Sequence, residues 1–401
     1  MARRFRTVHG RAVAALTRRF GVQRFALIEN AVQDAYVRAL ERWPLDGAPD
    51  DPERWLVRVA HNAMIDVLRG DPPAGELEEA YDVAAEPPAF DADDELRLMF
   101  LCCDPLLPRA AQVALLLNAA FGLSARQIAR AFLSDERTVA QRIVRAKQRL
   151  REQRRAFDVP GAAVLPERLG ALLDVLYLAF SEGYDPTVES AGDEDASLCS
   201  ESLRLVRLLT EARATALPAA FALRALLCFH ASRAPARIGS DGGLLLLPEQ
   251  DRTRWDGPSM GEAFACLERA AAGETLTRFH LEAGIAACHA AASGYAATDW
   301  PRVLALYELL REQAPSLVVD VNRALAVAMC RGARAGLDEL DAIPEREILA
   351  RYPYALAAYA DLQASLGNRA EARACLERAL EHQPSGAQQA LLRRKRAALE
   401  T

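Results

Sequence analysis

The sequence lacks the short motifs that mark many enzymes and metal sites. It contains no C-x-x-C pair, no glycine-rich phosphate loop and no nucleophile motif. We therefore expect no catalytic site, no metal and no other cofactor. An enzyme stays open as an alternative, because six histidines and many acidic residues are present; a scan with generic hydrolase substrates would test it.

The eight cysteines show no spacing of a disulfide framework or zinc site. We interpret them as buried free thiols of a reducing compartment. Cys102 and Cys103 are adjacent, and a redox or metal role for this pair, with His61, is the alternative. The remaining six stand singly: Cys199, Cys228, Cys266, Cys288, Cys330 and Cys375.

Long apolar runs are also missing. No run of about 18 apolar residues is present, so we expect no membrane span. The first twenty residues, "MARRFRTVHGRAVAALTRRF", are basic but lack a signal-peptide core. These features predict a cytoplasmic protein. Runs of β-branched residues are scarce while Ala, Leu, Arg and Glu dominate, which predicts an all-α fold of two or three domains in 401 residues.

The net charge of −6 hides an uneven distribution. Residues 1–70 hold 12 arginines against 8 acidic residues, and residues 106–157 hold 11 basic against 3 acidic ones. Between them, residues 71–105 hold 11 acidic residues and one arginine. Two basic blocks thus flank an acidic segment, and its proline-rich part, residues 71–95, reads as a linker. This pattern predicts two surfaces that face nucleic acid.

The second basic block contains a helix-turn-helix pattern at 124–151, "SARQIARAFLSDERTVAQRIVRAKQRLR". Ser124 and Gln127 form a capping box for a short helix, with Ile128 and Phe132 on its inner side. We expect Ser134 to cap a second helix. That helix has an apolar stripe at the spacing of one helix face: Val139, Ile143, Ala146 and Leu150.

The outward positions of the second helix carry side chains suited to DNA. Arg137 and Gln141 have hydrogen-bonding groups for base edges in the major groove. Thr138, Arg142 and Arg145 are better placed for phosphates. A basic, solvated helix in an ordinary bundle is the simpler alternative.

The first basic block predicts two helices, one over 26–43 and one after the turn "PLDGAPDDP". In the second we expect an inner face of Trp55, Leu56, Val59, Ala63 and Val67. An aromatic ring beside arginine and asparagine is a platform for unstacked bases. The candidate DNA-contacting residues of this helix are Trp55, Arg58, His61, Asn62 and Arg69.

The C-terminal body shows traces of a repeat. If Pro384 ends a unit of 34 residues, Ala360, Ala372 and Ala379 occupy its small-residue positions, and Gly367 with Asn368 lies in its turn. Pro315 ends a looser unit, and residues 316–349 form a degenerate one. This predicts stacked helix pairs over about 282–384, whereas residues 160–275 show no period, so a non-repeating bundle stays open there.

A loop signal interrupts the helices at 241–256, "DGGLLLLPEQDRTRWD". As structure, we expect a loop pinned by Arg–Asp pairs with Trp255 as its plug. As function, we expect a regulatory surface that contacts the N-terminal domains or their partner. The residues concerned are Asp241, Gly242, Gly243, Gln250, Asp251, Arg252, Arg254, Trp255 and Asp256.

Residues 11–69 and 96–151 together resemble a sigma-70 family RNA polymerase sigma factor of the extracytoplasmic-function group. "LIENAVQDAYVRALERW" looks like the helix that binds the polymerase β′ clamp, "WLVRVAHNAMIDVLRG" like the −10-reading helix and "RTVAQRIVRAKQRLR" like the −35-reading helix. The resemblance implies clamp contacts at Asn30, Gln33 and Asp34. It also implies that Asn62 captures a flipped −10 base.

The rest of the chain resembles one subgroup with a fused, TPR-like helical extension. The matching segments are "MFLCCDPLLPRAAQVALLL", "SEGY", "DGGLLLLPEQDRTRWD", "GIAACHA", "DWPRVLALYELL" and "VNRALAVA". Asp104 departs from the histidine of that pattern, and "ALIEN" is less acidic than its "LAED". The resemblance implies that the extension modulates activity through intramolecular contact with the sigma domains.

These expectations define four segments. Residues 1–70 form the −10-reading and polymerase-binding domain, 71–95 the linker, 96–157 the −35-reading domain and 158–401 the extension. The partners are core RNA polymerase and promoter DNA, with no membrane. The alternative is a dimeric helix-turn-helix regulator that binds DNA without polymerase. It predicts tight duplex binding by the isolated protein, whereas a sigma factor predicts weak, salt-sensitive binding.

Overall fold

The computed structural model describes residues 2–70, 88–132, 134–184, 193–240, 243–382 and 386–400. Within these residues the chain is all-α, as predicted, and carries only an isolated β-bridge between Ile238 and Leu244. None of the described helices is both long and apolar enough to cross a membrane. Most of the expected linker lies outside the described residues, and so do Asp241 and Gly242.

The chain divides into two compact units. The first holds the described residues up to 182 together with 193–215, and the second holds the other described residues from 183 onward. The expected segment boundaries stay a prediction. The first unit contains α1 (Ala2–Phe20), η1 (Val22–Arg24), α2 (Phe25–Asp46), α3 (Pro52–Gly70), α4 (Ala92–Cys102), α5 (Arg109–Ala119), α6 (Ala125–Ala131), α7 (Glu136–Glu152), most of α8 (Leu165–Tyr184) and α9 (Asp193–Glu211).

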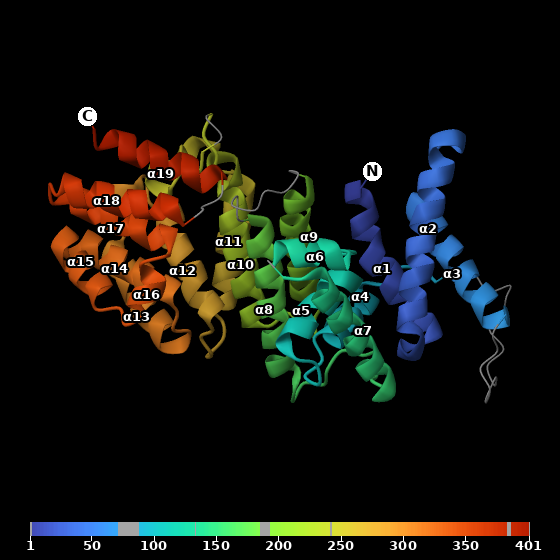
Figure 1. Cartoon of the computed structure of the whole chain (residues 1–401). Coiled ribbons are helices and arrows are strands. Elements are labelled where there is room, and N and C mark those ends of the chain that lie inside the picture. Colours follow the sequence, from blue (N-terminus) through green and yellow to red (C-terminus); the bar gives the residue numbers. More distant parts are fainter. Residues whose placement is uncertain are drawn as a thin grey trace. The chain divides into compact units, whose positions relative to one another are not determined.

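Helices α1, α2 and α3 pack on one another, and α4 packs along α1 (Figure 1). Helix α7 packs on α5 and α6, and also reaches α2 and η1. Large apolar side chains such as Phe20, Ile28 and Met64 are fully buried. The first unit is thus continuous from the first basic block to the second.

Close approach of α1 to the end of α5 depends on glycine. A Cβ atom at Gly10 would lie 2.5 Å from the backbone oxygen of Ala120. Gly122 has a φ of +67°, and a Cβ there would lie 3.0 Å from Cγ of His9. Any larger side chain would therefore force these segments apart.

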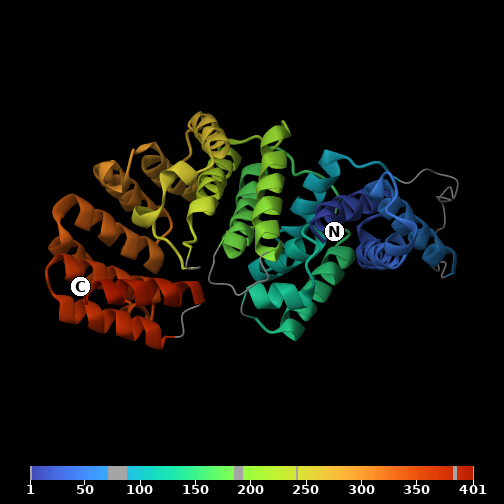
Figure 2. The ribbon, with the colours of Figure 1, turned by 90° about the horizontal axis from the view of Figure 1, so that it is seen from above.

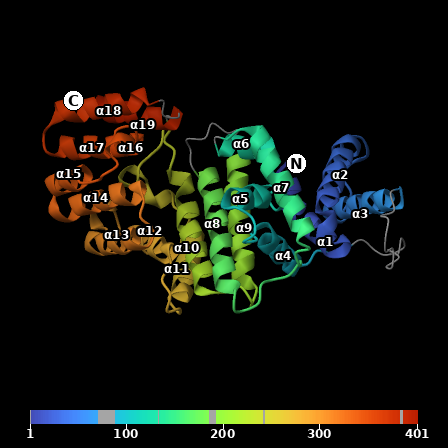
Figure 3. The same cartoon turned by 60° about the horizontal axis from the view of Figure 1, so that its bottom comes forward.

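The second unit contains α10 (Pro218–Arg233), η2 (Ala234–Ala236), η3 (Leu247–Glu249), η4 (Arg252–Arg254), α11 (Gly257–Ala270), α12 (Arg278–Ala291), η5 (Tyr295–Ala297), α13 (Trp300–Gln313), α14 (Leu317–Arg331), α15 (Ala333–Asp341), α16 (Arg346–Leu349), α17 (Pro353–Ser365), α18 (Arg369–Glu381) and α19 (Gly386–Ala398). Helices α12 to α18 stack as successive antiparallel pairs (Figure 3).

The repeat positions fall where the sequence predicts them. Ala360, Ala372 and Ala379 are at most 2% exposed, and Gly367 has a φ of +83° between α17 and α18. The pairs turn in an arc from α12 to α19, which Figure 2 shows from above. Helix α19 returns to the loop after η2: Arg394 donates to the backbone oxygen of Leu244 at 2.9 Å and pairs with Glu249.

Candidate nucleic-acid and polymerase interface

Helix α7 presents the side chains predicted to read the −35 element. The capping box of Ser124 and Gln127 is present at α6, but Asp135, not Ser134, caps α7 by accepting from the backbone nitrogen of Thr138. The cap prediction was wrong because the helix begins one residue later than expected. The predicted apolar stripe is confirmed, with all four side chains at most 6% exposed: Val139, Ile143, Ala146 and Leu150.

The opposite side of α7 is open to solvent. Arg137, Gln141, Arg142 and Arg145 are exposed along it. Thr138 is half-buried, and its hydroxyl donates to Asp135 at 3.0 Å. The structure therefore brings four of the five predicted residues together on one free face, whereas the hydroxyl of Thr138 already serves the helix cap.

Helix α3 presents most of the predicted −10 residues. Arg58, Asn62 and Arg69 are exposed and follow one another at helical spacing. Trp55 is half-buried and packs edge-to-face on Trp43, with ring centroids 5.4 Å apart. This contact fixes the orientation of the indole beside the exposed side chains.

His61 lies on the other side of α3. It is 2% exposed, and its ring centroid lies 5.4 Å from that of Phe20. Burial lowers the pKa of His61, with Arg19 adding to the effect and a hydrogen bond to Asn62 opposing it. His61 is therefore not part of the exposed set.

Of the expected inner face of α3, Leu56 is buried, whereas Trp55, Val59 and Ala63 are only half-buried. Leu56, Ala60, Met64 and Ile65 are buried, whereas Val67 is 46% exposed. The apolar pattern gave the wrong buried face because it placed the apolar Val67 inside and the polar His61 outside, whereas the structure has the reverse. The register that buries His61 is the one that exposes Asn62.

Helix α2 carries the predicted polymerase contacts on its free face. Asn30, Gln33 and Asp34 are exposed there, and Val37 at 53% and Leu40 at 56% continue the surface toward the helix end. Exposed apolar side chains beside polar ones are typical of a protein-binding surface. The sequence analysis did not single out these two apolar residues, although their outward position follows from helical spacing.

Sequence reasoning also missed the polar contacts that bind the two basic blocks together. Lys147 of α7 forms an ion pair with Glu29 of α2 and donates to Oδ1 of Asn118 at 3.0 Å. Burial raises the pKa of Glu29, and Lys147 opposes that shift. From the sequence, Lys147 is expected to be one more exposed basic residue of a DNA-facing helix. In the structure its side chain instead points toward α2.

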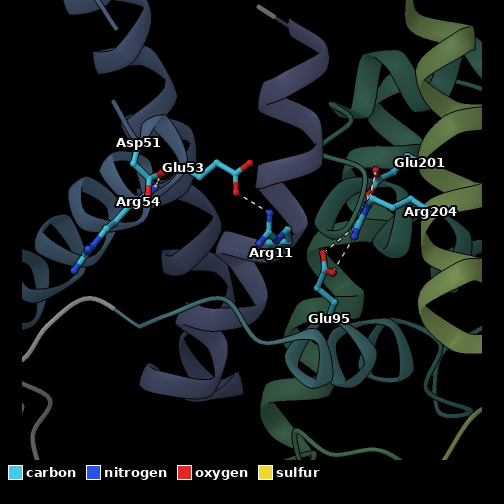
Figure 4. A network of polar contacts seen from close by, with 7 residues as sticks. All are labelled: Arg11, Asp51, Glu53, Arg54, Glu95, Glu201 and Arg204. Carbon is cyan, nitrogen blue, oxygen red and sulfur yellow. Dashed lines mark hydrogen bonds and ion pairs between the residues drawn. The ribbon is translucent and has the colours of Figure 1, made fainter. Parts of the chain in front are cut away.

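Helix α9 is joined to α4 through Arg204. Its guanidinium donates to both carboxylate oxygens of Glu95, at 2.9 and 2.8 Å, and to Glu201 of its own helix (Figure 4). On the neighbouring side Arg11 of α1 pairs with Glu53 of α3 at 2.7 Å. A bidentate arginine is among the stronger polar contacts in proteins, so Arg204 fixes α9 on α4.

Asp104, which stands where the resembled pattern has histidine, also forms ion pairs with arginine. Its side chain is 3% exposed and accepts from Arg155 at 2.6 Å, with Arg168 of α8 at 3.7 Å. The neighbouring Cys102 and Cys103 are buried, and burial raises the pKa of both thiols, that of Cys103 to about 12. Both thiols are therefore protonated at neutral pH.

The loop at 243–256 is ordered differently from the expectation. Trp255 is 7% exposed, so it does act as a plug. The expected Arg–Asp pairs are not found among the described residues of the loop, where Asp251 accepts from the backbone of Thr253 and Asp256 from that of Ser259. Short polar side chains at helix starts are used as caps there. Gly243 and Gln250 are buried, whereas Arg254 is exposed.

Comparison with known proteins gives three family matches along the chain. Residues 6–71 match sigma-70 region 2, residues 97–150 match sigma-70 region 4, and residues 168–271 match a family of unknown function, DUF6596. The region 2 match contains α2 and α3, and the region 4 match contains α7 except for its last two residues. Two of the three matched families are thus regions of sigma-70 factors.

Two relatives extend this result. The chain is 38% identical to an uncharacterized protein of Rhizobium meliloti (strain 1021) over 95% of its own length and 92% of the relative. It is 32% identical to the probable ECF RNA polymerase sigma factor SigI of Mycobacterium tuberculosis over 146 residues, which cover 33% of this chain and 49% of that relative. No solved structure matches the chain significantly.

The presence of both regions in this order favours a sigma factor over a regulator that acts without polymerase. The chain belongs to the extracytoplasmic-function group of sigma-70 RNA polymerase sigma factors, and it carries an additional helical C-terminal region.

Proposed function

We propose that this sigma factor reads the −10 element through α3 and the −35 element through α7, and that it binds the β′ clamp of core polymerase through α2. The −10 contacts are Arg58, Asn62 and Arg69, with Trp55 as a stacking surface and His61 as their buried support. The −35 contacts are Arg137, Gln141, Arg142 and Arg145, and the clamp contacts are Asn30, Gln33 and Asp34. It works in the cytoplasm, where polymerase and promoter DNA are.

We further propose that the first unit is a closed, resting arrangement of the two regions. Elements centred roughly 25 base pairs apart lie about 85 Å apart on B-DNA. A compact unit of about 200 residues has a radius of gyration of only about 17 Å. The two recognition helices must therefore separate before both elements are bound.

The observation that carries this proposal is the contact of Arg204 with Glu95. Helix α9, which lies in the additional C-terminal region, packs on both α1 and α4. It therefore contributes to holding α4 against α1, while Lys147 and Glu29 hold α7 against α2. The faces proposed for DNA and polymerase stay exposed. The closed arrangement therefore does not cover these faces, but it holds α3 and α7 too close together to reach both promoter elements. In this way the extension modulates initiation.

The test uses the full chain, because truncation after residue 157 would remove the partners of Glu95. Arg204→Ala removes the tie, and Gly10→Ala inserts a methyl group against Ala120. We expect both variants to give more promoter-dependent run-off transcript with core polymerase at limiting sigma factor. Gly161→Ala is the matched control, because a Cβ there meets nothing within 4 Å. Unchanged transcript from folded Arg204→Ala and Gly10→Ala would refute the closed resting state.

A further inference from the structure

Three arginines of the second unit lie close together without an acidic partner among the described residues. Arg233 ends α10, Arg237 follows η2, and Arg252 begins η4. By contrast, Arg224 of this unit pairs with Glu262, and Arg323 pairs with Glu308 and Glu339. The group of Arg233, Arg237 and Arg252, here called the arginine cluster, differs from these two arginines in lacking a carboxylate partner among the described residues.

The positive charge of the cluster lowers the pKa of neighbouring basic groups. Burial lowers the pKa of Arg233, and Arg237 and Arg252 lower it further. Burial together with Arg233 and Arg252 lowers the pKa of His289 to about 4. Burial together with Arg233 and Arg237 lowers that of His230 to about 3. Both histidines are therefore neutral at pH 7, and the charge of the site lies on the arginines.

Helix ends offset only part of this charge. Arg252 donates through Nη1 to the backbone oxygens of His289 and Ala292, at 2.6 and 2.8 Å, at the end of α12. Arg237 donates to the backbone oxygen of Tyr184, the last residue of α8. A helix C-terminus carries about −0.5 charge, so the ends of α8, α10 and α12 supply about −1.5 against three positive charges. A net positive charge remains.

The same place holds hydrogen-bond donors without acceptors. Nη2 of Arg252 and Nε1 of Trp255 are buried and have no partner among the described residues. The guanidinium carbon of Arg252 lies 4.6 Å from the centroid of the Trp255 ring, and that of Arg233 lies 5.8 Å away. Buried donors are almost always paired in native proteins, so two unpaired donors beside excess positive charge indicate a missing acceptor.

We propose that the arginine cluster, with Trp255, binds a small oxyanion, either a phosphate group or a carboxylate group. Guanidinium groups match the planar and bidentate geometry of both groups. The anion would neutralise the remaining charge and accept from Nη2 of Arg252 and Nε1 of Trp255. This assigns a ligand class to the loop at 243–256, and it does not depend on the proposed closed state of the first unit.

The experiment is equilibrium dialysis of the full chain against radiolabelled inorganic phosphate at constant ionic strength, without polymerase. We expect saturable binding of one phosphate per chain, and at least tenfold weaker binding by Arg233→Gln and Arg252→Gln. Arg334→Gln is the control, because its side chain is 76% exposed and pairs with Asp338. It should bind as the wild type does. Competition with acetate identifies the source: displacement at equal concentration indicates a carboxylate ligand, and no displacement a phosphate.

A thermal unfolding experiment separates ligand binding from a structural role. Without phosphate, Arg233→Gln should unfold at the wild-type temperature or above it, because it removes uncompensated charge. With saturating phosphate, the wild type should gain about 3–5 °C and Arg233→Gln nothing. Binding that does not saturate, equal affinity in the wild type and both variants, or a marked loss of stability in phosphate-free Arg233→Gln would each overturn the proposal.

Discussion

Lys147 of α7 forms a buried ion pair with Glu29 of α2. The side chain of Glu29 is only 3% exposed and that of Lys147 17%. Lys147 also holds Asn118, whose amide nitrogen donates to the backbone oxygen of Leu123 at 2.8 Å. One side chain of α7 therefore contacts both α2 and the residue that holds the turn before α6.

Removal of Lys147 should destabilise the first unit strongly. Lys147→Met leaves Glu29 buried without its partner, and breaking a buried pair in this way costs about 3–5 kcal/mol. Urea unfolding of the full chain, followed by circular dichroism, measures the loss in the first transition. Because the two regions are then less tightly held, we also expect stronger binding to core polymerase.

A double-mutant cycle supplies the control for this prediction. Glu29→Gln combined with Lys147→Met removes both charges, so the double variant should recover at least about 1 kcal/mol relative to Lys147→Met alone. Additive losses would mean that the two residues act independently, contrary to the geometry.

The contact between α1 and the end of α5 should be sensitive to acid through His9. Its ring stacks on Tyr36, with centroids 5.8 Å apart, and lies against Gly122. Burial, and then Lys147, lowers the pKa of His9 to about 4. The folded pKa lies below the unfolded value of about 6.5. The unfolded chain therefore takes up the proton first as the pH falls.

The stability that depends on neutral His9 is complete above about pH 6.5 and declines toward pH 4. The loss reaches up to roughly 3 kcal/mol over that window. Urea unfolding at several pH values measures it, and His9→Gln, which cannot be protonated, should show a flatter curve. Identical pH dependence in the two chains would contradict the assignment of this acid sensitivity to His9.

The local features of the fold followed from the sequence, whereas the contacts between segments did not. Helical periodicity was enough for the buried stripe at Val139 and Ile143, and the glycine at 367 marked the turn of its helix pair. Lys147 could not be placed, because a lysine on a basic helix reads as exposed unless its partner Glu29 is known. The predicted buried face of α3 was wrong for a related reason. His61 is buried because it packs on the ring of Phe20, and this contact cannot be seen in the apolar pattern of the helix.

The register of α3 gives a test that separates DNA recognition from folding. Asn62 is exposed, so Asn62→Ala should leave the unfolding temperature unchanged within about 1 °C while lowering open-complex formation at least tenfold. His61 is buried, so His61→Ala should lower stability by about 2–3 kcal/mol by leaving a cavity beside Phe20. Fluorescence of 2-aminopurine placed in the −10 element reports base extrusion, and calorimetry reports stability. Normal extrusion by Asn62→Ala would remove it from the proposed site.

Two arginines of α7 should differ in the kind of loss they cause. Arg137 lies at the start of the helix, where side chains reach base edges, so Arg137→Ala should cost about 1–3 kcal/mol on the preferred −35 sequence and relax preference at one position. Arg145 lies two turns later and is assigned to a phosphate. Arg145→Ala should weaken all promoters alike and reduce the salt slope of binding by about 1. Both are measured by holoenzyme binding to a set of single-base promoter variants at several salt concentrations. If Arg137→Ala instead weakened every sequence equally, with a reduced salt slope, Arg137 would be a backbone contact and the helix would enter the groove in a different register.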